Sequence, residues 1–163
     1  MENGFWSRGR WLSRLSARTG TDGAPAAIAG GAVIEPNGLV RQAGYFFSLF
    51  RRNWSARLYR VPAVMLDVSA PLLCPTSPEL QLIRREWIER VGELDEALEG
   101  AEVGLDYCLR VTEAGGQSVL EPTARARALA LLDSDLDDTT LSAIRLRDKH
   151  AGRSFQVWAP EVI

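Results

Sequence analysis

The sequence contains little of several residue types on which common protein classes depend. It has two cysteines, Cys74 and Cys108, and one histidine, His150. Two cysteines are too few for a disulfide-stapled scaffold and fit a reducing cytoplasm, where we expect the protein; neither belongs to a Cys-x-x-Cys pair, which argues against structural zinc. His150 has no partner ligands at helical or loop spacing, so we expect no metal site built on it.

Long apolar runs and an excess of one charge are also missing. No run reaches the about 18 apolar residues that span a bilayer, so we expect no transmembrane segment. The chain has 19 basic and 21 acidic residues, a net charge of −2, and so no general attraction to nucleic acid. With 163 residues, 46% of them hydrophobic, we expect one domain over residues 1–163, long enough to bury a core.

Glycine and proline divide the rest into short segments. The arginine- and serine-rich start predicts an amphipathic helix with Phe5, Leu12 and Leu15 inward, or an organelle transit peptide. Extended segments on either side of a turn at residues 36–38, short strands between residues 61 and 84, and strands at 117–122 and 155–160 alternate with other elements. Helices are predicted at residues 85–92, 105–116 and 135–152. This alternation predicts an α/β fold with a mixed sheet flanked by helices.

The segment from Pro36 to Leu66 contains neither Asp nor Glu. Residues 46–60 have no clear period and predict a long loop. Such a loop serves as an acceptor-binding or docking surface, or covers the core with its aromatic rings while its arginines stay in water. The arginines of the segment are Arg41, Arg51, Arg52, Arg57 and Arg60.

Three sequence blocks carry a family resemblance. "GGAVIEPNGLVRQAG", Gly30 to Gly44, has a strand, a Pro-Asx-Gly turn and a returning Ala-Gly; "LQLIRREWIERVGELDE", Leu80 to Glu96, has a strand ending in two arginines, a short helix and a Gly-x-x-Asp-Glu loop. "GLDYCLRVTEAGGQSVLEP", Gly104 to Pro122, is similar to a Glu-Asp-x-Asp-Leu-Cys-Leu-Arg helix followed by Ala-Gly and a strand ending in Pro. In this order and spacing the blocks resemble the C-terminal half of the family 2 glycosyltransferases, over roughly residues 30–127. The resemblance implies a partial GT-A fold.

The resemblance also implies an activity. Family members transfer a sugar from a nucleotide-sugar donor to an acceptor hydroxyl with inversion, a carboxylate taking the acceptor's proton. The catalytic candidates that the resemblance implies are Asp106, as part of the active-site carboxylate cluster, and Glu102. Glu102 is a surrogate base, because the register puts Gly104 where that carboxylate stands and Glu102 reaches it only from a bulged loop. The alternatives are a first-turn acid worth about 0.3–1 kcal/mol for Asp106 and a solvated acid for Glu102.

Four further residues are candidates for binding the acceptor. Asp95 and Glu96 are paired carboxylates that suit sugar hydroxyls, although the surrounding segment is acidic throughout. Arg84 and Arg85 follow a strand and suit a phosphate, or form surface ion pairs of little worth. Cys108 is expected to be a small core residue.

The sequence does not match the nucleotide-binding half of the family's proteins. The Asp-x-Asp motif that holds a divalent metal in that half is missing. Residues Asp133 to Asp135 match the motif but lie near the C-terminal end of the sequence, where the family does not have it. Ala128 or a neighbour stands where a histidine often completes the metal site. We therefore expect no cofactor in this chain alone, and Mn²⁺ or Mg²⁺ with a nucleotide-sugar if a partner half completes it. That partner is a separately encoded half or a second copy in a homo-oligomer. The alternative is a degenerate, non-catalytic module that binds a glycan or a protein, so whether the chain is an enzyme stays open.

Overall fold

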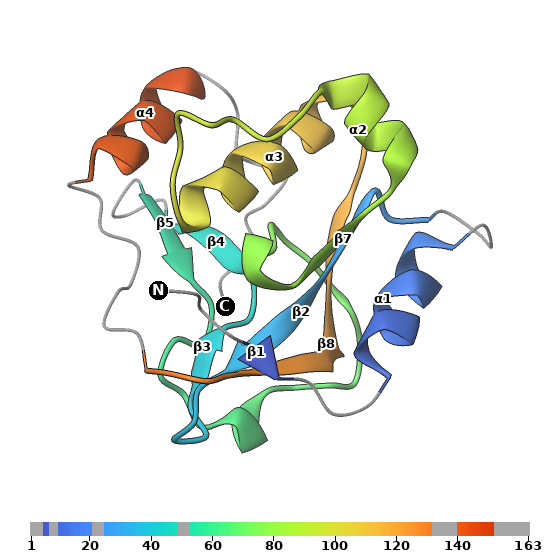
Figure 1. The fold of residues 1–163 in the computed structure, drawn as a ribbon, viewed down its shortest axis with the longest axis vertical. Coiled ribbons are helices and arrows are strands. Elements are labelled where there is room, and N and C mark those ends of the chain that lie inside the picture. The colour runs from blue at the N-terminus through green and yellow to red at the C-terminus, as the bar shows by residue number, and fades with distance from the viewer. Residues whose placement is uncertain (1–4, 7–9, 21–24, 49–52, 132–139, 152–163) are drawn as a thin grey trace.

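A computed structural model describes residues 5–6, 10–20, 25–48, 53–131 and 140–151. Over these residues a curled mixed sheet is flanked by helices, which confirms the predicted α/β class (Figure 1). The helices and 3₁₀ turns are α1 Trp11–Thr19, η1 Ala63–Met65, η2 Pro78–Leu80, α2 Arg85–Val91, α3 Ala101–Glu113 and α4 Leu141–Lys149. The strands are β1 Phe5–Trp6, β2 Ile28–Ile34, β3 Val40–Gln42, β4 Tyr45–Ser48, β5 Asn53–Ala56, β6 Leu72–Leu73, β7 Gln81–Ile83 and β8 Ser118–Ala128.

Strand β2 lies at the centre of the sheet. It runs parallel to β8 on one side, and on the other side it pairs antiparallel with β7 through residues 28–30 and with β3 through residues 33–34. All seven of its residues are buried, as expected for a strand covered on both faces. The outer neighbours of β8 are β6 and β1. Segments far apart in the sequence therefore meet around one strand.

The two faces of the sheet pack against different helices. Leu15 of α1 packs against Ala29 and Val33, while Cys108 of α3 packs with Ile28 on the other face. Beyond α3, the β4–β5 hairpin and α4 form a further apolar cluster that includes Tyr45, Trp54, Leu105, Leu109 and Leu146. Helix α3 is thus held from two sides, by the sheet and by this outer layer (Figure 1).

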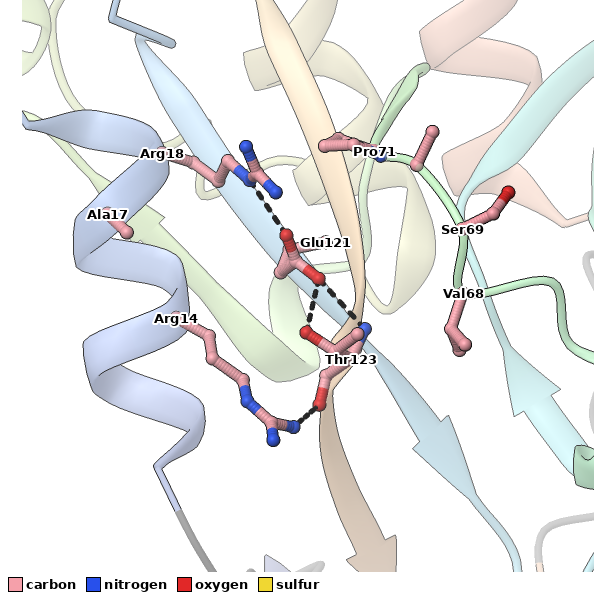
Figure 2. A pocket seen from close by; sticks show the side chains of 9 residues that line it. Arg14, Ala17, Arg18, Val68, Ser69, Pro71, Glu121 and Thr123 are labelled. Atoms are coloured by element: carbon pink, nitrogen blue, oxygen red, sulfur yellow. Dashed lines mark hydrogen bonds and ion pairs between the residues drawn. The ribbon is translucent and has the colours of Figure 1, made fainter. Parts of the chain in front are cut away.

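A large bulge interrupts the β2–β8 ladder. Gly30 pairs with Leu120 and Ala32 with Arg125, so residues 121–124 of β8 stand opposite Gly31 alone. A Cβ atom on Gly31 would lie 2.5 Å from the carbonyl oxygen of Ala124, so only glycine allows this approach. The bulge turns residues 121 and 123 of β8 toward α1 (Figure 2).

Several predicted elements are confirmed by the structure. The turn at residues 36–38 joins antiparallel β2 and β3, with Gly38 at φ 85°. Helix α2 ends where a glycine was expected to stop it, because Gly92 adopts φ 89°, a left-handed value that favours glycine. The short strands expected between residues 61 and 84 are β6 and β7.

Other predictions differ from the structure in element type, burial or boundary. The long loop at residues 46–60 contains β4 and β5, which pair antiparallel and place the rings of Phe47 and Trp54 edge to face at 5.4 Å. Phe5 belongs to a strand, and Leu12 is 51% exposed, so only Leu15 of the three predicted inward residues is a buried helical position. The strand expected to end at Pro122 continues to Ala128, since the bulge spares that proline any ladder hydrogen bond.

The start of α3 also differs from the prediction. The helix begins at Ala101, not near Gly104, so Asp106 lies in its second turn and the interpretation of Asp106 as a first-turn dipole partner is wrong. The predicted strand at residues 155–160, the Asp133–Asp135 motif and the first part of the predicted helix at 135–152 lie outside the described residues. Among the helices that the structure describes, none has the length and apolar character needed to cross a membrane.

Candidate functional site

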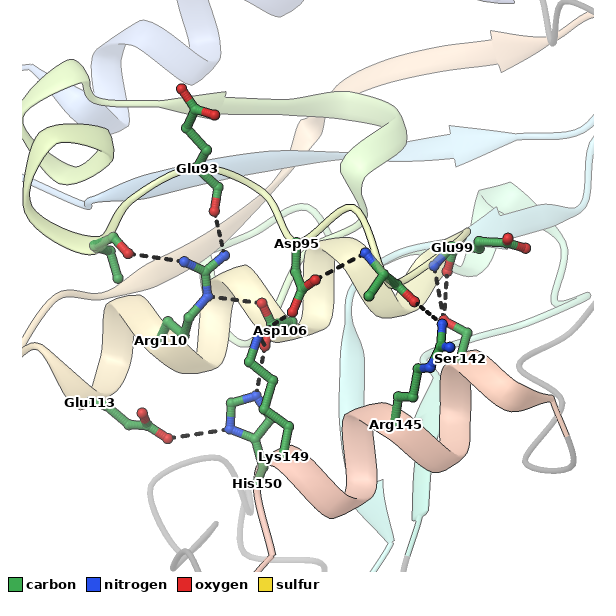
Figure 3. A network of polar contacts seen from close by, with 12 residues as sticks. Glu93, Asp95, Glu99, Asp106, Arg110, Glu113, Ser142, Arg145, Lys149 and His150 are labelled. Carbon is green, nitrogen blue, oxygen red and sulfur yellow. Dashed lines mark hydrogen bonds and ion pairs between the residues drawn. The ribbon is translucent and has the colours of Figure 1, made fainter.

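Asp106 is the centre of a buried ionic network between α3 and α4. Its side chain has no exposed surface. One carboxylate oxygen accepts a hydrogen bond from Nε of Arg110 at 2.8 Å, and the other lies 2.9 Å from both Nζ of Lys149 and Nε2 of His150 (Figure 3). Burial alone would raise the pKa of Asp106, but the hydrogen bonds from His150 and Lys149 and the charge of Arg110 lower it to about 2. Asp106 is therefore an ionised carboxylate with strong donors on both oxygens.

Lys149 brings Asp95 to the same network. Its Nζ lies 2.5 Å from Oδ2 of Asp95, and this hydrogen bond lowers the pKa of Asp95. Asp95 also accepts a hydrogen bond from the backbone N–H of Ala97, which fixes its orientation in the loop between α2 and α3. The structure thus joins one predicted acceptor-binding residue to one predicted catalytic residue. Glu96 follows Asp95 but lies exposed in the loop.

Arg110 ties this loop to α3. Its two terminal nitrogens donate to the backbone carbonyls of Val91, at 3.0 Å, and Glu93, at 2.8 Å (Figure 3). His150 is buried and reaches from Asp106 to Glu113, whose Oε1 lies 3.3 Å from Nδ1. Arg110, Lys149 and His150 therefore hold α2, α3 and α4 together through one carboxylate. Sequence reasoning missed these partners, although the four-residue spacing of Asp106 and Arg110 on a helix is a known ion-pair signal.

This geometry bears on the catalytic candidates. A general base works best with a pKa near the operating pH and with a free lone pair for the incoming proton. Asp106 does not suit this role, because its pKa is about 2, its side chain has no exposed surface, and Arg110, Lys149 and His150 already contact its oxygens. The arrangement favours a structural role, in which Asp106 holds α3 against α4.

Gly104, the position that the resemblance gives to the base, has no room for a side chain. A Cβ atom there would lie 2.5 Å from Cδ and 2.9 Å from N of Pro78, which belongs to the 3₁₀ turn in front of β7. Glu102 was expected to replace this carboxylate from a bulged loop. It instead lies in the first turn of α3, where residues two apart point about 200° away from each other. Glu102 therefore does not reach the space that a side chain at position 104 would fill.

Glu102 lies in a different buried polar environment. It is 7% exposed, and its charge acts together with that of Glu79 on Tyr45, whose pKa is raised first by burial and then by these carboxylates. Glu79 is itself 3.4 Å from Arg41, and its pKa is raised by burial despite this arginine. Arg41 also lies 3.7 Å from Glu35 and donates to the carbonyl oxygen of Ala130.

The interpretation of the arginines of residues 36–66 as solvated is wrong for Arg41. Its side chain is only 7% exposed, since acids from outside the acid-free segment reach it. Arg51 and Arg52 lie outside the described residues. The pattern within the segment contained no signal for this pair, because Glu79 stands 38 residues from Arg41 in the chain.

The predicted arginine pair does not join the network around Asp106. Arg84 forms an ion pair with Glu86 at 3.0 Å, as its surface interpretation expected, and Arg85 begins α2 with an exposed side chain. Cys108 is fully buried, with its pKa raised by burial, and packs in the core as expected. Among the described residues, no group of three His, Cys, Asp or Glu side chains could hold a metal ion.

Comparison with known sequences adds no family assignment. Neither a protein-family model nor a curated protein matches this chain.

Proposed function

We propose that this chain is the acceptor side of a nucleotide-sugar-dependent, inverting glycosyltransferase of the family 2 type, with part of a GT-A fold. One observation carries the proposal: the three resembling blocks assemble around a single strand. β2 and β3 come from the first block, β7 and α2 from the second, and α3 and the first half of β8 from the third. β2 hydrogen-bonds to β3, β7 and β8, while α3 packs on β2. A shared sheet is what the resemblance implies for these three blocks, and this arrangement supports the proposal.

The described residues suit binding of the acceptor, and the proposal assigns binding of the donor and its metal to another portion. The described residues provide no cluster of side chains for the divalent metal of such enzymes. A donor-binding portion, in the same or another polypeptide, would hold Mn²⁺ or Mg²⁺ with the nucleotide-sugar. The side-chain oxygens of Asp95 and Glu96 would bind acceptor hydroxyls, with Arg84 and Arg85 available to a phosphate on the acceptor. The buried free thiols Cys74 and Cys108 suit the reducing cytoplasm, where we place the protein.

Glu102 is the carboxylate of α3 that this proposal assigns to the acceptor's proton. Asp106 is committed to Arg110, Lys149 and His150, and position 104 has no side chain. Glu102 has only 7% of its surface exposed, which keeps bulk water away from a proton transfer. Asp106 then acts through α3, by fixing its position against α4 and the preceding loop.

A second function is favoured by the contact between Gly104 and Pro78. If packing against Pro78 leaves no room for a base at position 104, α3 keeps a close contact with the 3₁₀ turn and lacks the catalytic carboxylate. The chain would then be a non-catalytic module that binds a glycan or a protein partner.

A transfer assay with matched variants separates the two functions. The chain is assayed with radiolabelled UDP-, GDP- and dTDP-sugars and MnCl₂, alone and mixed with a transferase half encoded beside it, and in parallel on a glycan array. For the enzyme, Glu102→Gln lowers transfer by about 100-fold or more. Glu99→Gln, which changes an exposed acid of the same segment, leaves transfer unchanged.

The outcomes are distinct. Glycan binding without transfer, weakened by Glu96→Gln but unaffected by Glu102→Gln, supports the module. Transfer that Glu102→Gln leaves intact contradicts the assigned base, and neither transfer nor glycan binding refutes both functions.

A further inference from the structure

A pocket between α1 and the bulge of β8 is independent of the proposed function. It has a volume of about 200 Å³ and lies between Arg14 and Arg18 of α1, Glu121 and Thr123 of β8, and residues 68–71 of the segment before β6. Figure 2 shows the two arginines extending from α1 to the bulge, with Val68, Ser69 and Pro71 across the gap. Each water in the liquid occupies about 30 Å³, so the pocket has room for a phosphate group and several attached atoms.

Both arginines are held in place while keeping most of their donors available. Nε of Arg18 donates to Oε2 of Glu121 at 2.7 Å, and Nη1 of Arg14 donates to the carbonyl oxygen of Thr123. The other guanidinium nitrogens of these two side chains have no hydrogen-bond partner among the described residues. Anchoring one nitrogen fixes the plane of the guanidinium, so less conformational entropy is lost when the remaining donors bind a ligand.

Glu121 is the anchor that orients Arg18. It is 4% exposed and accepts hydrogen bonds from the backbone N–H and the hydroxyl of Thr123. Burial alone would raise the pKa of Glu121, but these hydrogen bonds and Arg18 lower it. Glu121 therefore contributes one negative charge against two positive charges, which leaves the pocket with a net charge of +1.

The spacing of the donors selects the ligand. Residues four apart on a helix have Cβ atoms about 5–6 Å apart, so two guanidinium groups from Arg14 and Arg18 can face one small anion. A tetrahedral phosphate presents oxygens in several directions and pairs well with two arginine forks. Val68 and Pro71 on the opposite wall suit an apolar group attached to that phosphate.

We propose that this pocket binds the phosphate group of a small ester with an apolar substituent. The ester is either a soluble molecule or the headgroup of a lipid. The second source is supported by the same chain segment, where Val64 is 90% and Met65 67% exposed and available to a lipid surface.

Binding of phenyl phosphate by saturation-transfer NMR tests the proposal on the full chain. Arg18→Ala should weaken binding by about ten-fold or more, the scale of one hydrogen bond between charged groups. Arg147→Ala, which removes an exposed arginine of α4, should leave it unchanged. Circular dichroism of each variant confirms that it is folded.

A second arm identifies the source of the phosphate. Co-sedimentation is measured with phosphatidylcholine vesicles that contain or lack phosphatidic acid. Sedimentation that requires phosphatidic acid and is lost in Arg18→Ala assigns a lipid, and phenyl phosphate binding without it assigns a soluble ester. Absence of both, equal binding by Arg18→Ala and the unchanged chain, or equally tight binding of benzoate overturns the proposal.

Discussion

Replacement of Asp106 by asparagine tests whether its network stabilises the fold. The substitution keeps the shape of the side chain and removes its charge, leaving Lys149 and Arg110 beside a neutral amide. The pKa of Asp106 falls from an ordinary value of 3.8 to about 2 in the folded chain. At about 1.4 kcal/mol for each pH unit, this difference corresponds to about 2 kcal/mol of stability at pH 7. Since removal of one partner from a buried ion pair costs about 3–5 kcal/mol, we expect Asp106→Asn to lower the free energy of unfolding by about 2–4 kcal/mol.

The pH dependence gives a second, independent check. A carboxylate whose folded pKa is lowered stabilises the fold above its unfolded pKa, and this stabilisation is lost as the pH falls through the folded value. For Asp106 the window runs from about pH 5 to pH 2, and at pH 3 about half of the linked stabilisation remains. The gap between the unchanged chain and Asp106→Asn should therefore narrow over this range.

Urea denaturation at pH 7 and pH 3, followed by circular dichroism, measures both quantities. Asp148→Asn is the control, because Asp148 is exposed and lies 3.9 Å from its only ion-pair partner among the described residues, Arg147. A loss below about 1 kcal/mol at pH 7, or a gap that stays constant between the two pH values, would refute the reasoning.

Two other changes test the packing directly. Gly104→Ala should lower the free energy of unfolding by about 1–3 kcal/mol, because the new Cβ meets Pro78 at 2.5 Å. Chemical denaturation measures this loss. Gly115→Ala is compared with it, because position 115 has open space but φ 87° and so shows the effect of backbone strain without a clash. Unchanged stability in Gly104→Ala would contradict the tight contact. The second change is chemical modification of the cysteines. Cys74 and Cys108 should react with Ellman's reagent at pH 8 only as the chain unfolds, since burial raises the pKa of Cys74 to about 12 and also raises that of Cys108. Stoichiometric reaction of the folded chain within seconds would show that the thiols are accessible.

Elements decided by neighbouring residues were predictable, and those decided by distant contacts were not. Helix α2 and its glycine stop, and the turn before β3, depend on backbone preferences within a few residues. β4 and β5 lack the strict alternation that marks a strand, and are held by pairing with each other and by packing on α3. Helix α3 approaches the 3₁₀ turn before β7 where Gly104 meets Pro78, a contact between residues far apart in the sequence.

The candidate site divides in the same way. The pair of Asp106 and Arg110 lies at helical spacing and could be read from the sequence. His150 stands 44 residues after Asp106, and no local pattern connects them. The resemblance indicated Asp106 and Glu102 as candidates, but their partners in the fold decide whether a carboxylate accepts protons or holds helices together.

The three faces of helix α3 have different packing or polar partners, and their requirements conflict at Gly104. The face with Cys108 must pack on the sheet, the face with Leu105 and Leu109 on the outer layer, and the remaining face carries Glu102 and Asp106. Gly104 lies where α3 approaches Pro78, so any carboxylate there would have to push the helix away from the sheet that positions it. An acid introduced at position 104 would thus gain a proton acceptor and lose the packing that orients it. If the chain is the proposed transferase, its base therefore lies elsewhere on α3, and Glu102 is the only acid in the first turn of that helix.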